Sequence, residues 1–179
     1  MISSASVVGG GIFHRKQIMK EIKTNKGGVI LVDDADFEIL NKWKWHISKY
    51  GYARRNIAVG FKRRKTLMLH NALFPKKEKG VVIDHIDGNR LNNQRNNLRI
   101  ANSSQNRINS CKPTGKKFSS KYKGVSWRKD KNKWISYTKL NSKFIYLGLF
   151  DKEILAAKAY DRKAKELFGS FARLNFPIQ

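Results

Sequence analysis

The chain has 179 residues, of which 40% are hydrophobic, so it can form one ordinary domain or two small ones. Its 38 lysines and arginines outnumber the 13 aspartates and glutamates, which leaves a formal net charge of +25. No apolar run approaches the roughly 20 residues that a membrane helix needs, and the N-terminus lacks the basic start and apolar core of a signal peptide. Since a chain this basic gains most by binding a polyanion, composition favours a nucleic-acid partner, no membrane contact and a cytoplasmic location.

The first half of the chain shows the patterns of several short elements. Residues 1–24 are rich in serine and glycine and then basic, with little periodicity, and they are expected to form a flexible tail. A first domain is expected over 25–110. Within it, 29–32 has the apolar run of a short strand, and 36–45 has the spacing of a capped helix. The stretch 66–74 has a helical pattern that ends before a proline.

A basic stretch with almost no apolar residues follows over 111–120 and contains Pro113 and Gly115. It predicts a linker to a second domain over 121–179. The only cysteine of the chain, Cys111, lies in this stretch and allows neither a disulfide nor a cysteine-based zinc site. Any metal must therefore bind to oxygen or imidazole ligands, which favours Mg²⁺ or Mn²⁺.

Two polar side chains interrupt a buried-looking strand near the end of the first domain. The strand spans 81–85 and runs into an Asp-Gly turn, and the interrupting residues are Asp84 and His85. A return strand is expected from residue 97 to residue 100. A short helix with good N-cap residues is expected over 102–109.

The pair Asp84-His85, followed by Asn97 and Asn106, resembles the signature of HNH nucleases, in which two strands and a helix hold one divalent metal. Residues 67–109 carry this resemblance, and their Asp-His-Ile-Asp-Gly-Asn run is similar to that of HNH homing endonucleases from phages and mobile introns. The resemblance implies that His85 is the general base and that Asn97 holds its ring. Asp84 and Asn106 would bind the metal.

These implied roles fit the chemistry of phosphodiester cleavage. An imidazole with a pKa near 6.5 is largely neutral at physiological pH and can accept a proton from water, while a metal on oxygen ligands polarises the phosphate and stabilises the leaving 3′ oxygen. Adjacent residues of a strand start on opposite faces, so Asp84 and His85 need a local twist or a metal at the strand edge. Asn109 could be the ligand instead of Asn106, although exposed helix surface is favoured for it. His70 is expected to be a packed histidine.

The second domain shows three alternating stretches over 121–128, 133–140 and 143–150, which predict an antiparallel sheet. A helix is expected between Asp151 and Gly169, with apolar residues at helical spacing. The fold class is therefore α+β, with a ββα-metal (HNH) core followed by a three-stranded antiparallel sheet and one helix packed across it.

Strand alternation assigns the two faces of this sheet. The face against the helix is expected to carry Val125, Trp127, Trp134, Ser136, Thr138, Ile145, Leu147 and Leu149. The opposite face is expected to carry Ser126, Arg128, Ile135, Tyr137, Lys139, Phe144 and Tyr146. A basic and aromatic open face can enter the major groove of DNA. The alternative is a face that the first domain covers.

The runs Tyr-Lys-Gly-Val-Ser-Trp at 122–127, Tyr-Leu-Gly-Leu-Phe-Asp at 146–151 and Leu-Asn-Phe-Pro at 174–177 are similar to those of AP2 DNA-binding domains. The resemblance implies that the sheet binds the major groove of double-stranded DNA. Its contact positions fall on Lys123, Ser126, Arg128, Tyr137, Lys139 and Tyr146, all but the first on the expected open face. Arg99 and Arg107 are expected to add charge-driven DNA contacts from the first domain.

The sequence therefore predicts a monomeric, Mg²⁺- or Mn²⁺-dependent HNH endonuclease that cuts or nicks double-stranded DNA. The joining of the two resemblances implies a homing endonuclease in a bacterial or phage-infected cell. The alternative is a sequence-specific DNA-binding regulator whose nuclease core is inactive. An RNA-binding protein is less favoured, because the deep, narrow major groove of RNA does not admit such a sheet.

Overall fold

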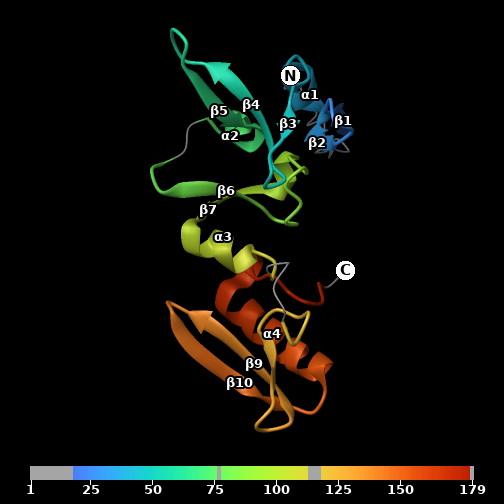
Figure 1. Cartoon of the computed structure of the whole chain (residues 1–179), viewed down its shortest axis with the longest axis vertical. Helices are drawn as coiled ribbons and strands as arrows, with labels where there is room; N and C mark the ends of the chain where they lie inside the picture. The colour runs from blue at the N-terminus through green and yellow to red at the C-terminus, as the bar shows by residue number, and fades with distance from the viewer. Residues whose placement is uncertain (1–17, 76–77, 113–117, 178–179) are drawn as a thin grey trace, which may run out of the picture.

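The computed structural model describes residues 18–75, 78–112 and 118–177. These residues form two units that follow each other along the long axis of the molecule (Figure 1). In this part of the chain the N-terminal unit holds three small antiparallel sheets and helices α1 to α3, and the C-terminal unit holds one three-stranded sheet and helix α4. Small sheets with few helices agree with the α+β class expected from the sequence.

The first elements of the described part of the chain form a hairpin, in which β1 (Met19–Lys23) pairs antiparallel with β2 (Val29–Asp33). The expectation of a tail over 1–24 is wrong for the residues of β1, because their pairing with β2 brings an otherwise polar segment into the fold. Residues 1–17 lie outside the described part of the chain.

A short helix and a second sheet follow the hairpin. Helix α1 (Asp34–Leu40) leads to β3 (His46–Ile47), β4 (Ala53–Ala58) and β5 (Arg64–Met68), which form a sheet in that order. Helix α2 (Leu69–Leu73) comes directly after β5. The stretch predicted as one helix is therefore half strand, because pairing with β4 fixes its first residues in extended conformation.

The third sheet has the strand–strand–helix order that the sequence predicted. Strand β6 (Val81–His85) pairs antiparallel with β7 (Leu98–Asn102), which follows a single 3₁₀ turn, η1 (Arg95–Asn97). Helix α3 (Ser103–Asn109) starts at once with a capping box between its N-cap asparagine and a glutamine three residues later.

The long loop between β6 and η1 is fixed to the first hairpin. The backbone of Leu31 in β2 donates to the carbonyl of Leu91 at 2.9 Å and accepts from the backbone amide of Asn93 at 2.8 Å. The backbone amide of Arg95 donates to the carboxylate of Asp33 at 2.8 Å. These contacts join segments about 60 residues apart, and they hold the loop that carries the next part of the site.

The C-terminal unit is a sheet with one helix across a face. Strands β8 (Val125–Arg128), β9 (Lys133–Leu140) and β10 (Lys143–Phe150) pair antiparallel in the order β10–β9–β8. Helix α4 (Glu153–Phe168) packs against them and ends in a 3₁₀ turn, η2 (Gly169–Phe171). All the elements predicted for this domain are present.

A bulge in β10 changes which residues face the helix. Tyr146 pairs with Tyr137, but the next pair is Gly148 with Ser136, so Leu147 is the extra residue. The bulge reverses the alternation, so Leu149 lies opposite Ile135 on the open face. The prediction that Leu149 faces the helix is therefore wrong, because alternation alone does not reveal an inserted residue.

Each unit has its own apolar core. The buried cluster of the N-terminal unit centres on Ile30, Val32 and Trp45, and the cluster of the C-terminal unit centres on Val125 and the alanines of α4. Among the described residues, these two clusters have no member in common. A search of the described helices finds none that combines the length and apolar character needed to cross a membrane.

Candidate active site and nucleic-acid surface

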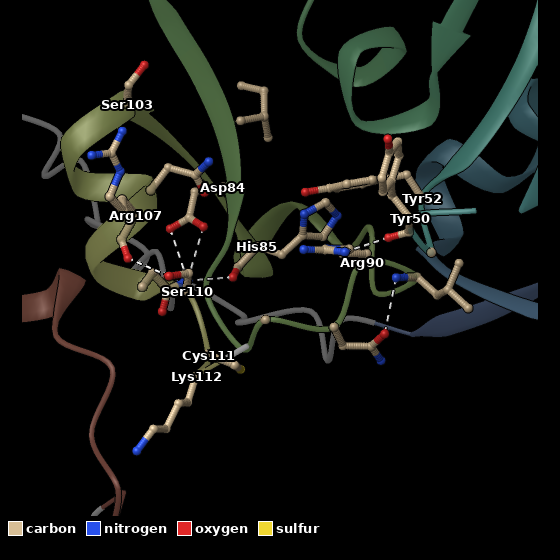
Figure 2. A pocket seen from close by; sticks show the side chains of 17 residues that line it. Tyr50, Tyr52, Asp84, His85, Arg90, Ser103, Arg107, Ser110, Cys111 and Lys112 are labelled. Atoms are coloured by element: carbon tan, nitrogen blue, oxygen red, sulfur yellow. Dashed lines mark hydrogen bonds between the residues drawn. The ribbon is translucent and has the colours of Figure 1, made fainter. Parts of the chain in front are cut away.

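A cavity of about 810 Å³ lies between the C-terminal end of β6, the loop that follows it and helix α3 (Figure 2). Asp84 and His85 both border it, with their side chains on either side of the β6 ribbon. Adjacent residues of a strand point to opposite faces, but the cavity lies at the end of β6, so both side chains can border it.

His85 is held by the loop that follows its strand. Its Nε2 lies 3.4 Å from the amide oxygen of Asn93, and both side chains are buried. An amide oxygen can only accept a hydrogen bond, so this contact favours the tautomer with the ring proton on Nε2. The other ring nitrogen, Nδ1, is then the one with a free lone pair. His85 is thereby oriented as a proton acceptor.

The surroundings of His85 also keep it neutral. The ring lies against Tyr52 and His70, with ring centroids 5.9 and 5.3 Å away. Burial lowers the pKa of His85 below its ordinary value of 6.5, although the hydrogen bond to the amide oxygen of Asn93 and the carboxylates of Asp87 and Asp84 act in the opposite direction. His70 is buried and packed against other rings, as the sequence predicted.

Asp84 is oriented by two neighbours. Arg99, its partner in β7, donates from Nε to Oδ2 at 2.9 Å and forms an ion pair with the same oxygen at 2.8 Å. The amide nitrogen of Asn109 donates to Oδ1 at 3.0 Å and to Oδ2 at 3.1 Å. Oδ2 therefore already has both Arg99 and Asn109 as partners. Among the described residues, Oδ1 accepts only from the amide of Asn109 and keeps a lone pair for another ligand.

The structure separates the two asparagines of α3. Asn109 is buried, and its amide also donates to the carbonyl of His85 at 2.8 Å. The expectation that Asn109 lies on the helix surface is therefore wrong. Asn106 is exposed one turn earlier on the same helix face and borders the cavity. Its amide oxygen is available to a metal, whereas the Asn109 amide holds Asp84 in place.

Asn97 does not hold the ring of His85. Its side-chain oxygen accepts from the backbone amide of Asp87 at 3.0 Å, and its nitrogen donates to the carboxylate of Asp87 at 2.9 Å and to the carbonyl of Asn92 at 2.8 Å. Asn97 therefore fixes the loop, and Asn93 in that loop contacts the ring. The prediction chose the wrong asparagine, because sequence spacing does not show how the loop folds back.

The donor set can hold a hard divalent cation. Among the described residues that border the cavity, Asp84 is the only acid, and no group of three or more His, Cys, Asp and Glu side chains in the described ranges could hold a metal by itself. Mg²⁺ commonly binds through one or two carboxylates and keeps water and substrate phosphate as its other ligands. A carboxylate with an amide oxygen beside it fits this pattern.

The open face of the C-terminal sheet carries most of the expected DNA contacts. By register, Tyr137 lies opposite Tyr146 and Lys139 lies opposite Phe144, and Ser126 shares this face. Tyr146 and Phe144 are 57% and 55% exposed, and the rings of Phe144 and Tyr137 stack at 4.7 Å. The aromatic side chains of Tyr146 and Phe144 on this face are thus accessible to a partner.

Arg128 is also on this face, but its guanidinium is engaged. It donates to both carboxylate oxygens of Asp130 at 2.8 Å, and this partner raises the pKa of Arg128 and lowers the pKa of Asp130 to about 2. Both side chains are exposed, and an exposed pair of this kind is easily exchanged for a phosphate or a base edge.

Two of the expected DNA-binding residues lie elsewhere. The ammonium of Lys123 donates to the carbonyls of Ile108 and Ser110 at the end of α3, because the positive φ of Gly124 turns the chain before β8 begins. Arg99 is occupied by Asp84 and is mostly buried. Neither side chain is placed for a DNA contact in this structure. Arg107, in contrast, is exposed and borders the cavity.

Comparison with known proteins supports both halves of the sequence interpretation. An AP2-like ethylene-responsive transcription factor of Arabidopsis thaliana is 35% identical over 65 residues, which cover 36% of this chain and 21% of that protein. The similarity to such factors falls in the C-terminal part of the chain. The AP2 resemblance inferred from the sequence is therefore confirmed.

Further matches include the nuclease half of the chain. The model of the HNH endonuclease family matches residues 73–108. Protein 3.8 of Escherichia phage T7 is 39% identical over 95 residues, which cover 53% of this chain and 76% of that protein. A protein described as an uncharacterized HNH endonuclease of Acanthamoeba polyphaga mimivirus is 34% identical over 155 residues, which cover 84% of this chain and 76% of the relative. The chain belongs to the HNH endonuclease family.

Proposed function

We propose that this HNH endonuclease is metal-dependent and hydrolyses a phosphodiester bond of double-stranded DNA in the cavity between His85 and Asp84. The observation that carries the proposal is that two acceptors border one cavity: the ring of His85, which contacts Asn93 through Nε2, and Oδ1 of Asp84, which accepts from the amide of Asn109 and keeps a second lone pair. The first suits proton transfer and the second suits a cation, which are the two requirements of metal-assisted hydrolysis.

In the proposed reaction, Nδ1 of His85 takes a proton from a water molecule. The water oxygen forms a bond to phosphorus, and the bond from phosphorus to the 3′ oxygen breaks. Asp84 and Asn106 would hold a divalent metal, which supplies charge stabilisation at the phosphate and the leaving oxygen. Arg107 and Arg90 border the same cavity and add positive charge where the DNA backbone must enter. Asn93 keeps the ring of His85 in the required orientation.

The test is cleavage of supercoiled plasmid by the purified chain. With Mg²⁺ or Mn²⁺, nicked or linear product is expected, EDTA should stop its formation, and excess Mg²⁺ should restore it. Cleavage that survives EDTA contradicts the metal dependence. A chain that binds one DNA sequence selectively but cuts with neither metal would instead be the alternative, a DNA-binding regulator with an inactive nuclease core.

The lowered pKa of His85 gives a second expectation. The neutral imidazole is the active form, so the single-turnover rate should fall at acid pH as the ring becomes protonated. Because burial lowers the pKa of His85 below 6.5, the midpoint of this acid limb is expected below pH 6.5. The measurement is the cleavage rate from pH 5 to pH 8 at saturating Mg²⁺. A midpoint at or above 6.5 would contradict a buried, neutral base.

We further propose that the open face of the C-terminal sheet supplies most of the specific DNA affinity. Lys139→Ala or Tyr146→Ala should weaken binding to a site selected from random DNA by about 1–3 kcal/mol per lost base contact, with little loss on unrelated DNA. Lys158→Ala, an exposed change on α4 away from this face, is the matched control. Equal losses on selected and unrelated DNA would show that these side chains contact only phosphates.

Two observations support a homing role for the enzyme. The first is that the relatives of this chain include a protein of a mimivirus and a protein of a phage. The second is the addition of an AP2-like sheet to the nuclease, which lengthens the DNA site. Selection of cleaved sequences from random DNA is expected to return a site of moderate length, and cleavage without sequence preference would contradict the role.

A further inference from the structure

The boundary between the two units is polar. The two apolar clusters share no residue among those described, so no common core fixes how one unit is oriented on the other. Units joined only by a linker normally move relative to each other unless their interface is large and hydrophobic. The contacts that cross this boundary therefore determine whether the chain is one body or two.

Two lysines cross the boundary in opposite directions. Lys112, at the end of the nuclease unit, donates to the carbonyls of Ser120, Tyr122 and Val125 at 2.8, 3.0 and 3.3 Å. Lys123, at the start of the sheet unit, donates to the carbonyl of Ile108 and to that of Ser110 at 2.8 Å.

The acceptors and the burial of these lysines make the contacts specific. The carbonyls bound by Lys123 belong to the end of α3, where the last carbonyls of a helix lack partners within the helix. Burial lowers the pKa of Lys123 to about 8, which leaves its ammonium mainly charged at neutral pH, and burial also lowers the pKa of Lys112.

Two arginines form a second pair of contacts between the units, closer to the active site. Arg99 of β7 donates to the carbonyl of Ser170 at 2.6 Å and stacks on the ring of Phe171 at 3.9 Å. Arg173 of the sheet unit donates to the carbonyl of Asp87 at 2.7 Å. Asp87 lies two residues after the base His85, so the sheet unit contacts the loop that positions the catalytic strand.

We propose that Lys112, Lys123, Arg99 and Arg173 lock the nuclease unit and the sheet unit into one orientation, so that the cut falls at a fixed distance from the DNA sequence bound by the sheet. The acceptors are main-chain carbonyls in both units, so each of these hydrogen bonds holds the backbone of the opposite unit in place. The second half of the inference rests on the proposed function of the sheet as the DNA-binding surface.

The lysines allow a test that leaves His85 and Asp84 with their partners, although Lys112 borders the cavity, whereas Arg99 also holds Asp84. In the double variant Lys112→Met and Lys123→Met, methionine keeps most of the apolar length and removes the donors. On end-labelled DNA with a selected site, the parent enzyme is expected to cut each strand at one bond. The double variant is expected to bind the same site and to spread its cuts over several neighbouring bonds. Lys158→Met, an exposed lysine of α4, is the matched control and should keep the single position.

A second measurement does not depend on cleavage. Spin labels at Lys65→Cys in β5 and Arg162→Cys in α4, in a Cys111→Ser background, report the distance between the units. A narrow distribution in the parent that broadens in the double variant supports the lock; a broad parent distribution, or no change in the variant, overturns it. If the distribution broadens but the cuts stay at one bond, the fixed distance has another origin and that half of the proposal is wrong. If no variant cuts DNA, the proposed function fails, and the distance distributions still decide whether the lock exists.

Discussion

Replacement of Asp84 by alanine is expected to abolish metal-dependent cleavage. Asp84 is the only acid among the described residues that border the cavity, so its loss removes the only charged ligand for a divalent cation. Calorimetric titration with Mn²⁺ should show that binding by the parent is lost in the variant. Retained metal affinity would place the metal elsewhere in the molecule.

Stability must be separated from chemistry in this experiment. Alanine leaves Arg99 as a buried cation without its carboxylate, which destabilises a fold by several kcal/mol in typical cases. Asp84→Asn keeps the shape of the side chain and is expected to lose cleavage with a smaller loss of thermal stability. The matched control is Asp36→Asn, which breaks the ion pair with Arg95 outside the cavity and should leave metal binding intact.

Replacement of His85 by alanine is expected to lower the single-turnover cleavage rate by about 10²-fold or more, which is the usual contribution of a positioned general base. DNA affinity should stay nearly unchanged, because the buried ring of His85 is not a surface contact. The acid limb of the rate below pH 6.5 should disappear with the ring. Gel-shift titration and rate measurement on the same DNA separate the two effects.

His46→Ala is the matched control for this variant. His46 is an exposed histidine in β3 and does not border the cavity, so its loss should change neither the rate nor the acid limb. If His85→Ala cuts as fast as the parent, His85 is not the base, and the proton must be transferred by another group.

The sequence predicted the structure of those segments whose contacts are with residues nearby in the chain. The β6–β7–α3 order and the N-terminus of α3 arise from contacts within about 30 residues, and strand pattern, turn residues and N-cap residues are enough to reveal them. The same holds for the sheet and helix of the C-terminal unit. In both places hydrophobic periodicity and turn residues agree with the fold.

The errors lie where distant segments meet. Asn93 reaches His85 because the hairpin strand β2 holds the loop through Leu31, and no local pattern distinguishes Asn93 from Asn97. The run of asparagines after the Asp-Gly turn was the only available signal. Lys123 was assigned to DNA from the family pattern, but the carbonyls at the end of α3 bind it. The sequence does not reveal these partners, because they belong to the other unit and meet Lys123 only in the folded chain.

The separate cores have a consequence for how this enzyme can change its target. Residues on the open sheet face, such as Tyr146 and Phe144, are exposed and belong to neither buried cluster. Substitutions there are expected to cost little stability, since exposed side chains away from caps and cores usually contribute less than about 0.5 kcal/mol. On the proposed role of the sheet, single surface changes are expected to give affinity for a new DNA sequence without a change in the catalytic unit.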